Sequence, residues 1–154
     1  MFCSGFRGEG LERKAAQEKL RIDVNFVPDE GMVVRESINS SELELDTEVF
    51  KFSGPVRAEA QVSRITNAVI VRLKLEAKAH GICCRCLNDF DVLFSKTIDL
   101  NYPVEDLSST IDLNPDIREE LILDYPINPL CKADCRGLCA KCGKNLNDAE
   151  CDCK

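Results

Sequence analysis

Four cysteines near the end of the chain have a spacing that suits a metal ion. Cys139 and Cys142 form a C-x-x-C pair, and Cys151 and Cys153 follow as a C-x-C pair after eight intervening residues. A C-x-x-C turn lets two sulfurs face one ion, and Gly143 permits the positive φ that turns backbone amides toward the thiolates. Because four thiolates meet the tetrahedral coordination of Zn²⁺, we predict a structural zinc site here.

A second set of four cysteines is divided between the middle of the chain and its C-terminal part. Cys83 and Cys86 repeat the C-x-x-C spacing, and Cys131 and Cys135 supply two further thiols. Neither pair fills a tetrahedral site alone, so we expect all four to hold one zinc ion. That ion would close a loop of 44 intervening residues. The sequence therefore predicts about two zinc ions per chain.

Other interpretations of these residues stay open. The cysteines could be ordinary buried side chains, and an iron–sulfur cluster also uses four cysteines, although the knuckle glycine favours zinc. Cys3 and Cys84 fall outside the two sets, and we interpret them as buried or simply exposed thiols. His80 precedes Cys83 by three residues, within reach of a metal, but we interpret it as a surface histidine at a strand end.

The sequence offers no recognisable active site. It contains no Walker A motif, no dinucleotide-binding glycine fingerprint and no G-x-S-x-G motif. One histidine in a cysteine-rich neighbourhood does not suit a Cys–His nucleophile pair. We therefore expect a protein that is not an enzyme, and we infer no small-molecule substrate.

Composition fits one domain with a small appendage. The 154 residues are 44% hydrophobic, and no apolar run approaches the roughly 20 residues that cross a membrane. The N-terminus lacks the apolar core of a signal peptide, so we predict a cytoplasmic protein whose thiols stay reduced. The net charge is −7, but residues 131–154 hold five basic side chains against four acidic ones, so the acidity belongs to the body.

Alternating apolar and polar residues predict the strands that must position these cysteines. The predicted strands are residues 20–27, 49–53, 56–65, 69–77 and 91–102. Short turns between successive strands favour a mainly β (α+β) fold, an antiparallel β-sandwich or open barrel. One helix is predicted at about 115–124, with Asn114 as its cap and Pro115 at its first position.

The same patterns predict three parts of the chain. Residues 1–18 form a loose leader, residues 19–126 form the antiparallel β domain with its helix, and residues 127–154 form a C-terminal zinc-binding tail packed on that domain.

The cysteine motifs resemble those of a known family. The residues that carry the resemblance are Cys83-x-Arg85-Cys86-Leu87 and Pro129-Leu130-Cys131-x3-Cys135-x-Gly137-Leu138-Cys139-x2-Cys142-Gly143-x-Asn145-Leu146-Asn147. Together with the preceding strands, they are similar to the bacterial YceD family from about residue 49 to the end. The resemblance implies a role in accumulation of large-subunit (23S) ribosomal RNA. It implies no catalytic residue, and many members lack the C-terminal cysteines, so the metal is interpreted as holding shape.

From the resemblance we expect a binding protein in large-subunit ribosome biogenesis. Its partner would be large-subunit rRNA or its precursor, or a basic ribosomal or assembly protein. The candidate RNA contacts are Arg85, Lys132, Arg136, Lys141 and Lys144, which equally suit a role in balancing thiolate charge. Two alternatives belong to other classes: a zinc-dependent nuclease or hydrolase acting on rRNA, and a thiol redox sensor using Cys84 or Cys3.

Overall fold

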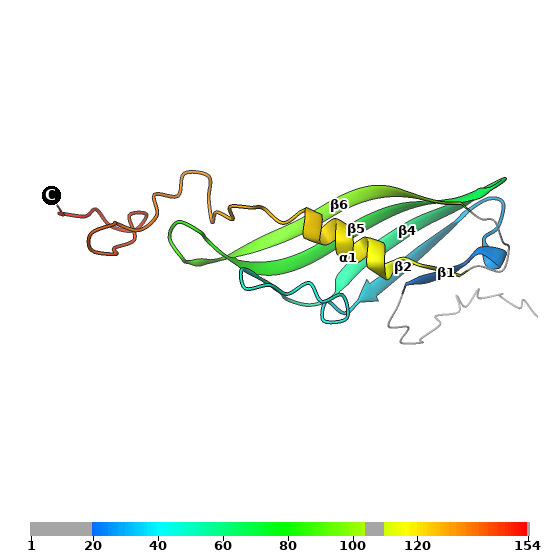
Figure 1. The fold of residues 1–154 in the computed structure, drawn as a ribbon, viewed down its shortest axis with the longest axis horizontal. Helices are drawn as coiled ribbons and strands as arrows, with labels where there is room; N and C mark the ends of the chain where they lie inside the picture. The colour runs from blue at the N-terminus through cyan, green and yellow to red at the C-terminus, as the bar shows by residue number, and fades with distance from the viewer. Residues whose placement is uncertain (1–19, 104–109, 154) are drawn as a thin grey trace, which may run out of the picture.

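The computed structural model describes residues 20–103 and 110–153, so the predicted leader and Cys3 lie outside the described residues. The predicted mainly antiparallel β fold with one helix is confirmed for this part of the chain (Figure 1). In it, no helix is long and apolar enough to cross a membrane.

Five strands form the main sheet. They are β2 (Met32–Ile38), β3 (Phe50–Phe52), β4 (Val56–Ile65), β5 (Ala68–Ile82) and β6 (Asp89–Pro103). β6 pairs with the whole of β5, from Ala68 opposite Pro103 to Ile82 opposite Asp89. The other edge of β5 is shared by β4 and β3, and β2 pairs with the far side of β4. All of these pairings are antiparallel. Because β5 pairs with β6 on one edge and with β4 and β3 on the other, it is the central strand.

A smaller sheet and a helix complete the fold. β1 (Arg21–Asp23) pairs with β7 (Thr110–Asp112), and α1 (Asn114–Leu123) follows directly. The predicted strand over residues 20–27 is wrong after Asp23, because a 3-10 turn, η1 (Val24–Phe26), interrupts it. The Asp23 carboxylate accepts from the Asn25 amide and so stabilises that turn. Strand β2 was not predicted, because Arg35, Glu36 and Ser37 break its apolar alternation.

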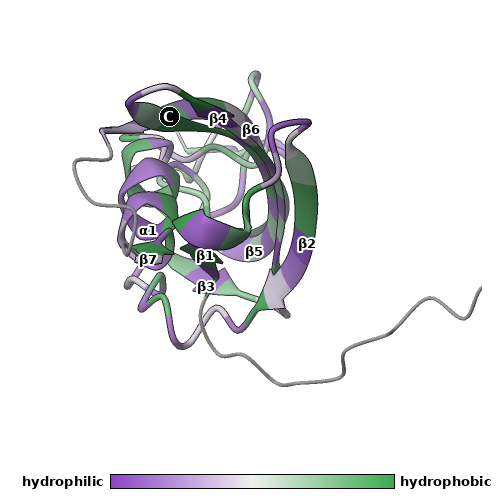
Figure 2. Ribbon diagram, turned by 90° about the vertical axis from the view of Figure 1, so that its right-hand side faces the viewer, coloured by the Kyte–Doolittle hydropathy of each residue, from purple (hydrophilic) through white to green (hydrophobic). Residues whose placement is uncertain are grey.

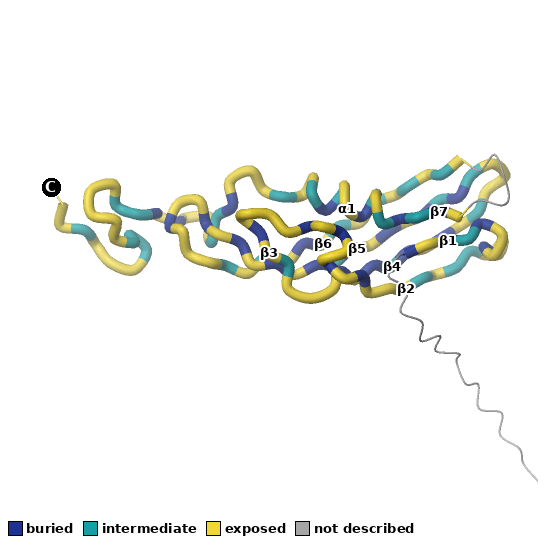
Figure 3. The backbone as a smooth tube through the Cα atoms, turned by 60° about the horizontal axis from the view of Figure 1, so that its bottom comes forward, coloured by how far each residue is buried: buried dark blue, intermediate teal, exposed yellow. Residues whose placement is uncertain are grey.

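Alternation along the long strands builds the core. In β4 the residues Val56, Ala58, Ala60 and Val62 are all buried, while their neighbours are exposed or half-buried. β5 alternates in the same way, as Figure 3 shows by the regular change of burial along the strands. The sheet curves around α1 and the β1–β7 pair (Figure 2), and α1 buries Ile117 and Leu121 against it.

The helix start differs from the prediction. Its N-cap is Leu113, which offers no side-chain hydrogen bond, and Pro115 is the second helical residue rather than the first. The Asn114 carboxamide oxygen instead accepts from the Leu20 amide at 3.1 Å, over 94 residues of chain. A tertiary contact has therefore taken the side chain that a local cap would use.

Two features bring the tail to the sheet. The connection between β5 and β6 carries Cys83 to Cys86 at the tip of the longest hairpin. After α1, the Tyr125 hydroxyl donates to the Leu45 carbonyl at 2.7 Å, and its ring packs with Phe50, Phe52 and Phe94. This aromatic cluster fixes where the chain leaves the body. The boundary between a domain and a tail at residues 126 and 127 stays a prediction.

Candidate metal centres

Two turns of the same construction present the C-x-x-C pairs. In the first, the Leu87 amide donates to the Cys83 carbonyl at 3.0 Å and the Cys83 amide donates to the Asn88 carbonyl at 3.0 Å. In the second, Gly143 and Lys144 take the places of Leu87 and Asn88, with distances of 2.9 and 2.8 Å. We call these turns knuckle one (residues 83–88) and knuckle two (residues 139–144).

The residue after the second cysteine has a positive φ in both knuckles. Gly143 has φ 72°, as the sequence predicts for a knuckle glycine, and Leu87 has φ 59° at the matching position. A β-carbon is unfavourable in this left-handed region, so knuckle one is locally strained where knuckle two is not. The sequence motif did not reveal this strain, because leucine at that position gives no sign of its backbone conformation.

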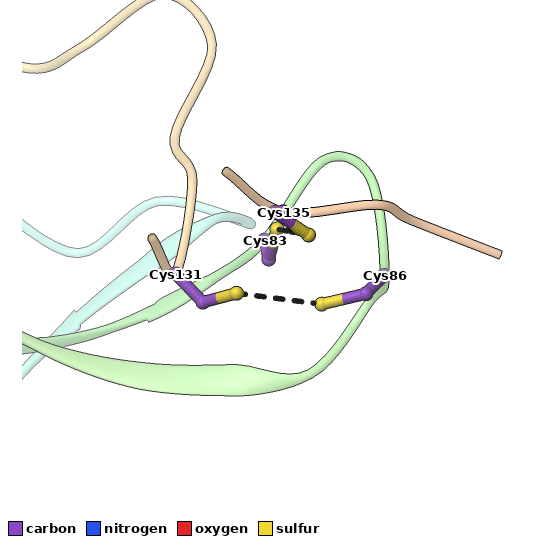
Figure 4. Close-up of side chains that lie close together, drawn as sticks. All are labelled: Cys83, Cys86, Cys131 and Cys135. Carbon is purple, nitrogen blue, oxygen red and sulfur yellow. Dashed lines mark hydrogen bonds between the residues drawn. The ribbon is translucent and has the colours of Figure 1, made fainter. Parts of the chain in front are cut away.

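Knuckle one meets two cysteines from the tail (Figure 4), and these four thiols are named site one. The sulfurs of Cys83 and Cys135 are 3.7 Å apart, and those of Cys86 and Cys131 are 3.6 Å apart. All four sulfurs lie within 4.8 Å of one another. Cys83, Cys86 and Cys135 are 0–3% exposed, and they pack with Phe90, Leu130 and Leu138 in a second, smaller core.

Knuckle two is joined by the last two cysteines, and these four thiols are named site two. The Cys151 sulfur lies 3.2 Å from that of Cys139 and 3.4 Å from that of Cys142. Again all four sulfurs lie within 4.8 Å of one another. Unlike site one, site two is open to solvent, because Cys142 and Cys153 are exposed and the other two are half-buried.

The sulfur geometry fits one tetrahedral ion at each site. With a Zn–S distance of about 2.3 Å, the edge of a ZnS₄ tetrahedron is about 3.8 Å. The sulfur–sulfur separations of 3.6 and 3.7 Å in site one lie close to that edge, and those of 3.2 and 3.4 Å in site two are somewhat shorter. All four are far from the roughly 2.05 Å of a disulfide. None of the nine cysteines that the structure describes forms a disulfide. A polynuclear iron–sulfur cluster would hold its thiolates further apart, around bridging sulfides.

Electrostatics within each set also point to a cation. Burial raises the pKa of the Cys83 thiol, but the amides of Cys86, Cys131 and Arg85 outweigh it and bring that pKa to about 6. Burial and the neighbouring sulfurs raise the pKa of Cys131 to about 12. Four thiolates so close repel one another, and a divalent cation would supply the charge that offsets this repulsion.

Site two likewise contains one thiol with a lowered pKa and one with a raised pKa. The backbone amides of Cys142 and Lys141 lower the pKa of the Cys139 thiol to about 6. The Cys153 amide lowers the pKa of Cys151, but the sulfurs of Cys153, Cys139 and Cys142 raise it further, to about 12. Each set thus contains a thiol that ionises easily beside one that resists.

Arg85 fastens the tail to knuckle one. Its Nη1 donates to the Cys135 carbonyl at 3.0 Å, and its own carbonyl accepts from the Leu138 amide at 3.1 Å. Gly137, with φ 74°, makes this approach possible, because a β-carbon there would lie 3.0 Å from the Arg85 carbonyl oxygen. The Cys84 amide adds a hydrogen bond to the Pro129 carbonyl at 2.9 Å.

Asn147 is a residue at the site whose role the sequence reasoning missed. Its Nδ2 donates to the Cys135 sulfur at 3.4 Å, and this hydrogen bond is the largest cause of a lowered pKa at that thiol. Its Oδ1 accepts from the Arg136 amide at 2.9 Å. The signal was its place in the motif that ends Asn145-Leu146-Asn147, but only folding shows which sulfur the side chain meets.

The remaining candidate residues are placed as follows. Cys84 is exposed, and it belongs to neither set of four. His80 lies in β5, is exposed, and pairs through Nδ1 with the Asp91 carboxylate rather than with a cysteine. The five basic candidates are all exposed: Arg85, Lys132, Arg136, Lys141 and Lys144. The eight grouped cysteines are brought together as two sets, and their role as metal ligands stays a prediction.

The fold and these sites define a β-sheet protein with two tetracysteine centres. The family model described as large ribosomal RNA subunit accumulation protein YceD matches residues 101–154. This match confirms the resemblance to the YceD family over the segment that holds six of the eight grouped cysteines.

Relatives extend the similarity toward the N-terminus. An uncharacterized protein of Mycobacterium leprae is 28% identical over 117 residues, which cover 66% of this chain and 54% of that protein. The chloroplastic large ribosomal RNA subunit accumulation protein YCED homolog 1 of Arabidopsis thaliana is 41% identical over 54 residues, 35% of this chain and 16% of that protein. The Zea mays protein of that name is 33% identical over 75 residues, 48% of this chain and 25% of its own length.

The chain therefore spans about half, or less, of the length of these relatives. No solved structure matches it.

Proposed function

We propose that this protein is a non-enzymatic zinc-binding protein of the cytoplasm that acts in large-subunit ribosome biogenesis and supports accumulation of 23S rRNA. The observation that carries the proposal is the convergence of eight thiols into two sets of four, one of which ties the YceD-matched segment to the sheet. The names of the plant relatives supply the process. The proposed role of the metal is to hold the tail in one shape on the β5–β6 hairpin, and the meeting of Cys131 and Cys135 with Cys83 and Cys86 supports it.

A structural role for zinc follows from the donor sets. Each set contains four cysteines and no histidine or carboxylate, so a bound ion would have all four tetrahedral positions filled by the protein. Catalytic zinc keeps one position for water, and a hydrolase acting on rRNA would need that open position. The donor sets therefore favour a binding protein over the nuclease.

Charge supports one of the two proposed partners, a basic protein, over rRNA. A Zn²⁺ ion with four thiolates carries −2, so the two sites together would carry −4. Residues 131–153, which supply six of the eight thiolates, hold four basic and four acidic side chains and so do not offset this charge. The outer face of the sheet neutralises itself through ion pairs such as Arg35–Glu59 at 2.7 Å and Arg72–Asp99 at 2.8 Å. This balance favours a basic ribosomal or assembly protein as the partner.

Direct contact with rRNA or its precursor is the second route that we propose to test. Four exposed basic side chains near the metal sites could meet phosphates: Lys132, Arg136, Lys141 and Lys144. Arg85 is less free for this, because its guanidinium already donates to the Cys135 carbonyl.

Removal of the protein from its host tests the function. We expect the ratio of large- to small-subunit rRNA to fall, and the wild-type chain to restore it. A Cys86→Ser variant, which lacks one ligand of site one, should restore it poorly, while Cys84→Ser should restore it fully. Elemental analysis of the purified protein should give about two zinc ions per chain. An unchanged rRNA ratio would contradict the proposed process, and absence of zinc under reducing conditions would contradict the metal.

A salt series separates the two partners. If the tail lysines contact phosphates, the Lys141/Lys144 double alanine variant should lower the salt slope of binding to protein-free rRNA by roughly two units. A matched control is the Lys51/Lys74 double alanine variant, which removes two lysines that are paired with carboxylates on the sheet. No binding of wild type at low salt would exclude naked RNA and leave the protein route.

A further inference from the structure

Asn147 contacts site one and lies within the loop whose two ends carry cysteines of site two. Its Nδ2 donates to the sulfur of Cys135 in site one at 3.4 Å, and to the Oδ1 of Asn145 at 2.7 Å. Its Oδ1 accepts from the Arg136 amide at 2.9 Å, directly after Cys135. The side chain is half-buried, and all its polar atoms are engaged, so its orientation is well defined.

The position of Asn147 depends on the loop that site two closes. The loop runs from Cys142 to Cys151, whose sulfurs are 3.4 Å apart. Within it, the amides of Asp148 and Ala149 both donate to the Asn145 carbonyl, and the Asn147 amide donates to the Asn145 side chain. A metal that joins the two ends of this loop would hold the turn that aims Asn147 at site one.

The backbone makes the same connection. Leu138 forms a β-bridge with Asn145, and the Leu146 amide donates to the Gly137 carbonyl at 2.9 Å. On the other side of the segment Gly137–Leu138, the Leu138 amide donates to the Arg85 carbonyl of knuckle one. The segment after Cys135 is therefore held by knuckle one on one side and by the loop from Cys142 to Cys151 on the other.

We propose that Asn147 is a positioning residue that couples the two sites, so that metal at site two raises the affinity of site one. The inference rests on the proposed metal binding but not on the role in rRNA accumulation. An amide that donates to a thiolate sulfur stabilises the metal-binding form, and loss of such outer contacts costs about 10- to 100-fold in metal affinity. Because coupling of binding is reciprocal, metal at site one must raise the affinity of site two by the same factor.

The test measures zinc affinity by competition with a chromophoric chelator in the full chain. Cys142→Ser removes a ligand of site two and leaves site one to be measured. We expect Cys142→Ser and Asn147→Ala each to weaken site one by about 10-fold. In the Cys142→Ser/Asn147→Ala double variant we expect the fold loss of zinc affinity at site one to be clearly smaller than the product of the two single fold losses. Asn101→Ala, the same change on the exposed outer face of β6, should leave site one unchanged.

Asn147→Asp separates a donor to sulfur from a merely structural side chain. Aspartate keeps the oxygen that accepts from the Arg136 amide but loses the N–H group that donates to Cys135. If Asn147 acts through the sulfur, Asp should fail to restore affinity, and the absorption bands of the cobalt-substituted site one should shift from those of wild type. Restoration of wild-type affinity by Asp, or an unchanged site one in Cys142→Ser, would overturn the proposal. Failure of the wild type to bind two ions would instead overturn the proposed metal binding itself.

Discussion

Substitution of Gly137 by alanine tests how closely the tail approaches knuckle one. Two costs add at this position. A residue with a β-carbon at φ 74° loses about 1–2 kcal/mol relative to glycine. The new β-carbon would also lie 3.0 Å from the Arg85 carbonyl oxygen and 3.3 Å from the Arg85 β-carbon, and both atoms belong to the knuckle rather than to a flexible side-chain end. Overpacking of this kind costs about 1–3 kcal/mol.

Together these costs predict a loss of at least about 2 kcal/mol in docking of the tail, or about 30-fold in zinc affinity at site one. The loss of zinc affinity appears at site one because the tail can escape both costs by moving away from knuckle one, which takes Cys131 and Cys135 away from Cys83 and Cys86. The hydrogen bond from the Leu138 amide to the Arg85 carbonyl should weaken at the same time. The assay is zinc competition with a chelator, with site one followed in the full chain.

Two other glycines provide matched controls. Gly143 has φ 72° and Gly54 has φ 93°, but a β-carbon at either position would meet nothing within 4 Å. Alanine at Gly143 should therefore weaken site two by the backbone cost alone, about 1–2 kcal/mol. Alanine at Gly54 should leave both sites unchanged and lower only the unfolding free energy of the sheet. If Gly137→Ala weakens site one no more than Gly143→Ala weakens site two, the close approach described here is wrong.

Three further predictions concern strain, exposure and pH. Leu87→Gly should raise the affinity of site one by about 1 kcal/mol, because glycine adopts the positive φ at this position without the cost of a β-carbon. An unchanged or weaker affinity would contradict the strain at Leu87. A chelator should remove metal first from site two, which is exposed, and only later from site one, which is buried. Variants with Cys142→Ser or Cys86→Ser would show which site loses its metal first, and the reverse order would contradict the difference in burial. Burial raises the pKa of Tyr125 to about 12, and burial with Asp116 raises that of Tyr102, the only other tyrosine. Because these folded-state pKa values exceed the unfolded value of about 10, the stability they confer is complete below pH 10 and is lost as pH rises through the folded values. Tyrosinate absorbance in the native protein should therefore appear well above pH 10, and a titration centred on 10 would refute this.

The sequence by itself determined the class of fold and the grouping of its thiols. Alternation through residues 56–63 and 71–77 is typical of a half-buried strand, because side chains point to opposite faces at each step. Spacing was equally informative for Cys139 and Cys142, since a C-x-x-C turn is a local structure. Where alternation was weak, as in residues 32–38, the strand became visible only through its pairing with β4.

Tertiary structure decided what no local pattern contains. The side chain of Asn114 suits a helix cap, but folding brings the Leu20 amide to it from 94 residues away. Likewise, Leu87 adopts a positive φ because knuckle one must turn its amide to the Cys83 carbonyl, and leucine gives no warning of this. The placement of Asn147 on the sulfur of Cys135 arises only when the loop from Cys142 to Cys151 folds back on the tail. These contacts join residues whose relative positions depend on the whole chain, so short-range propensities carry no information about them.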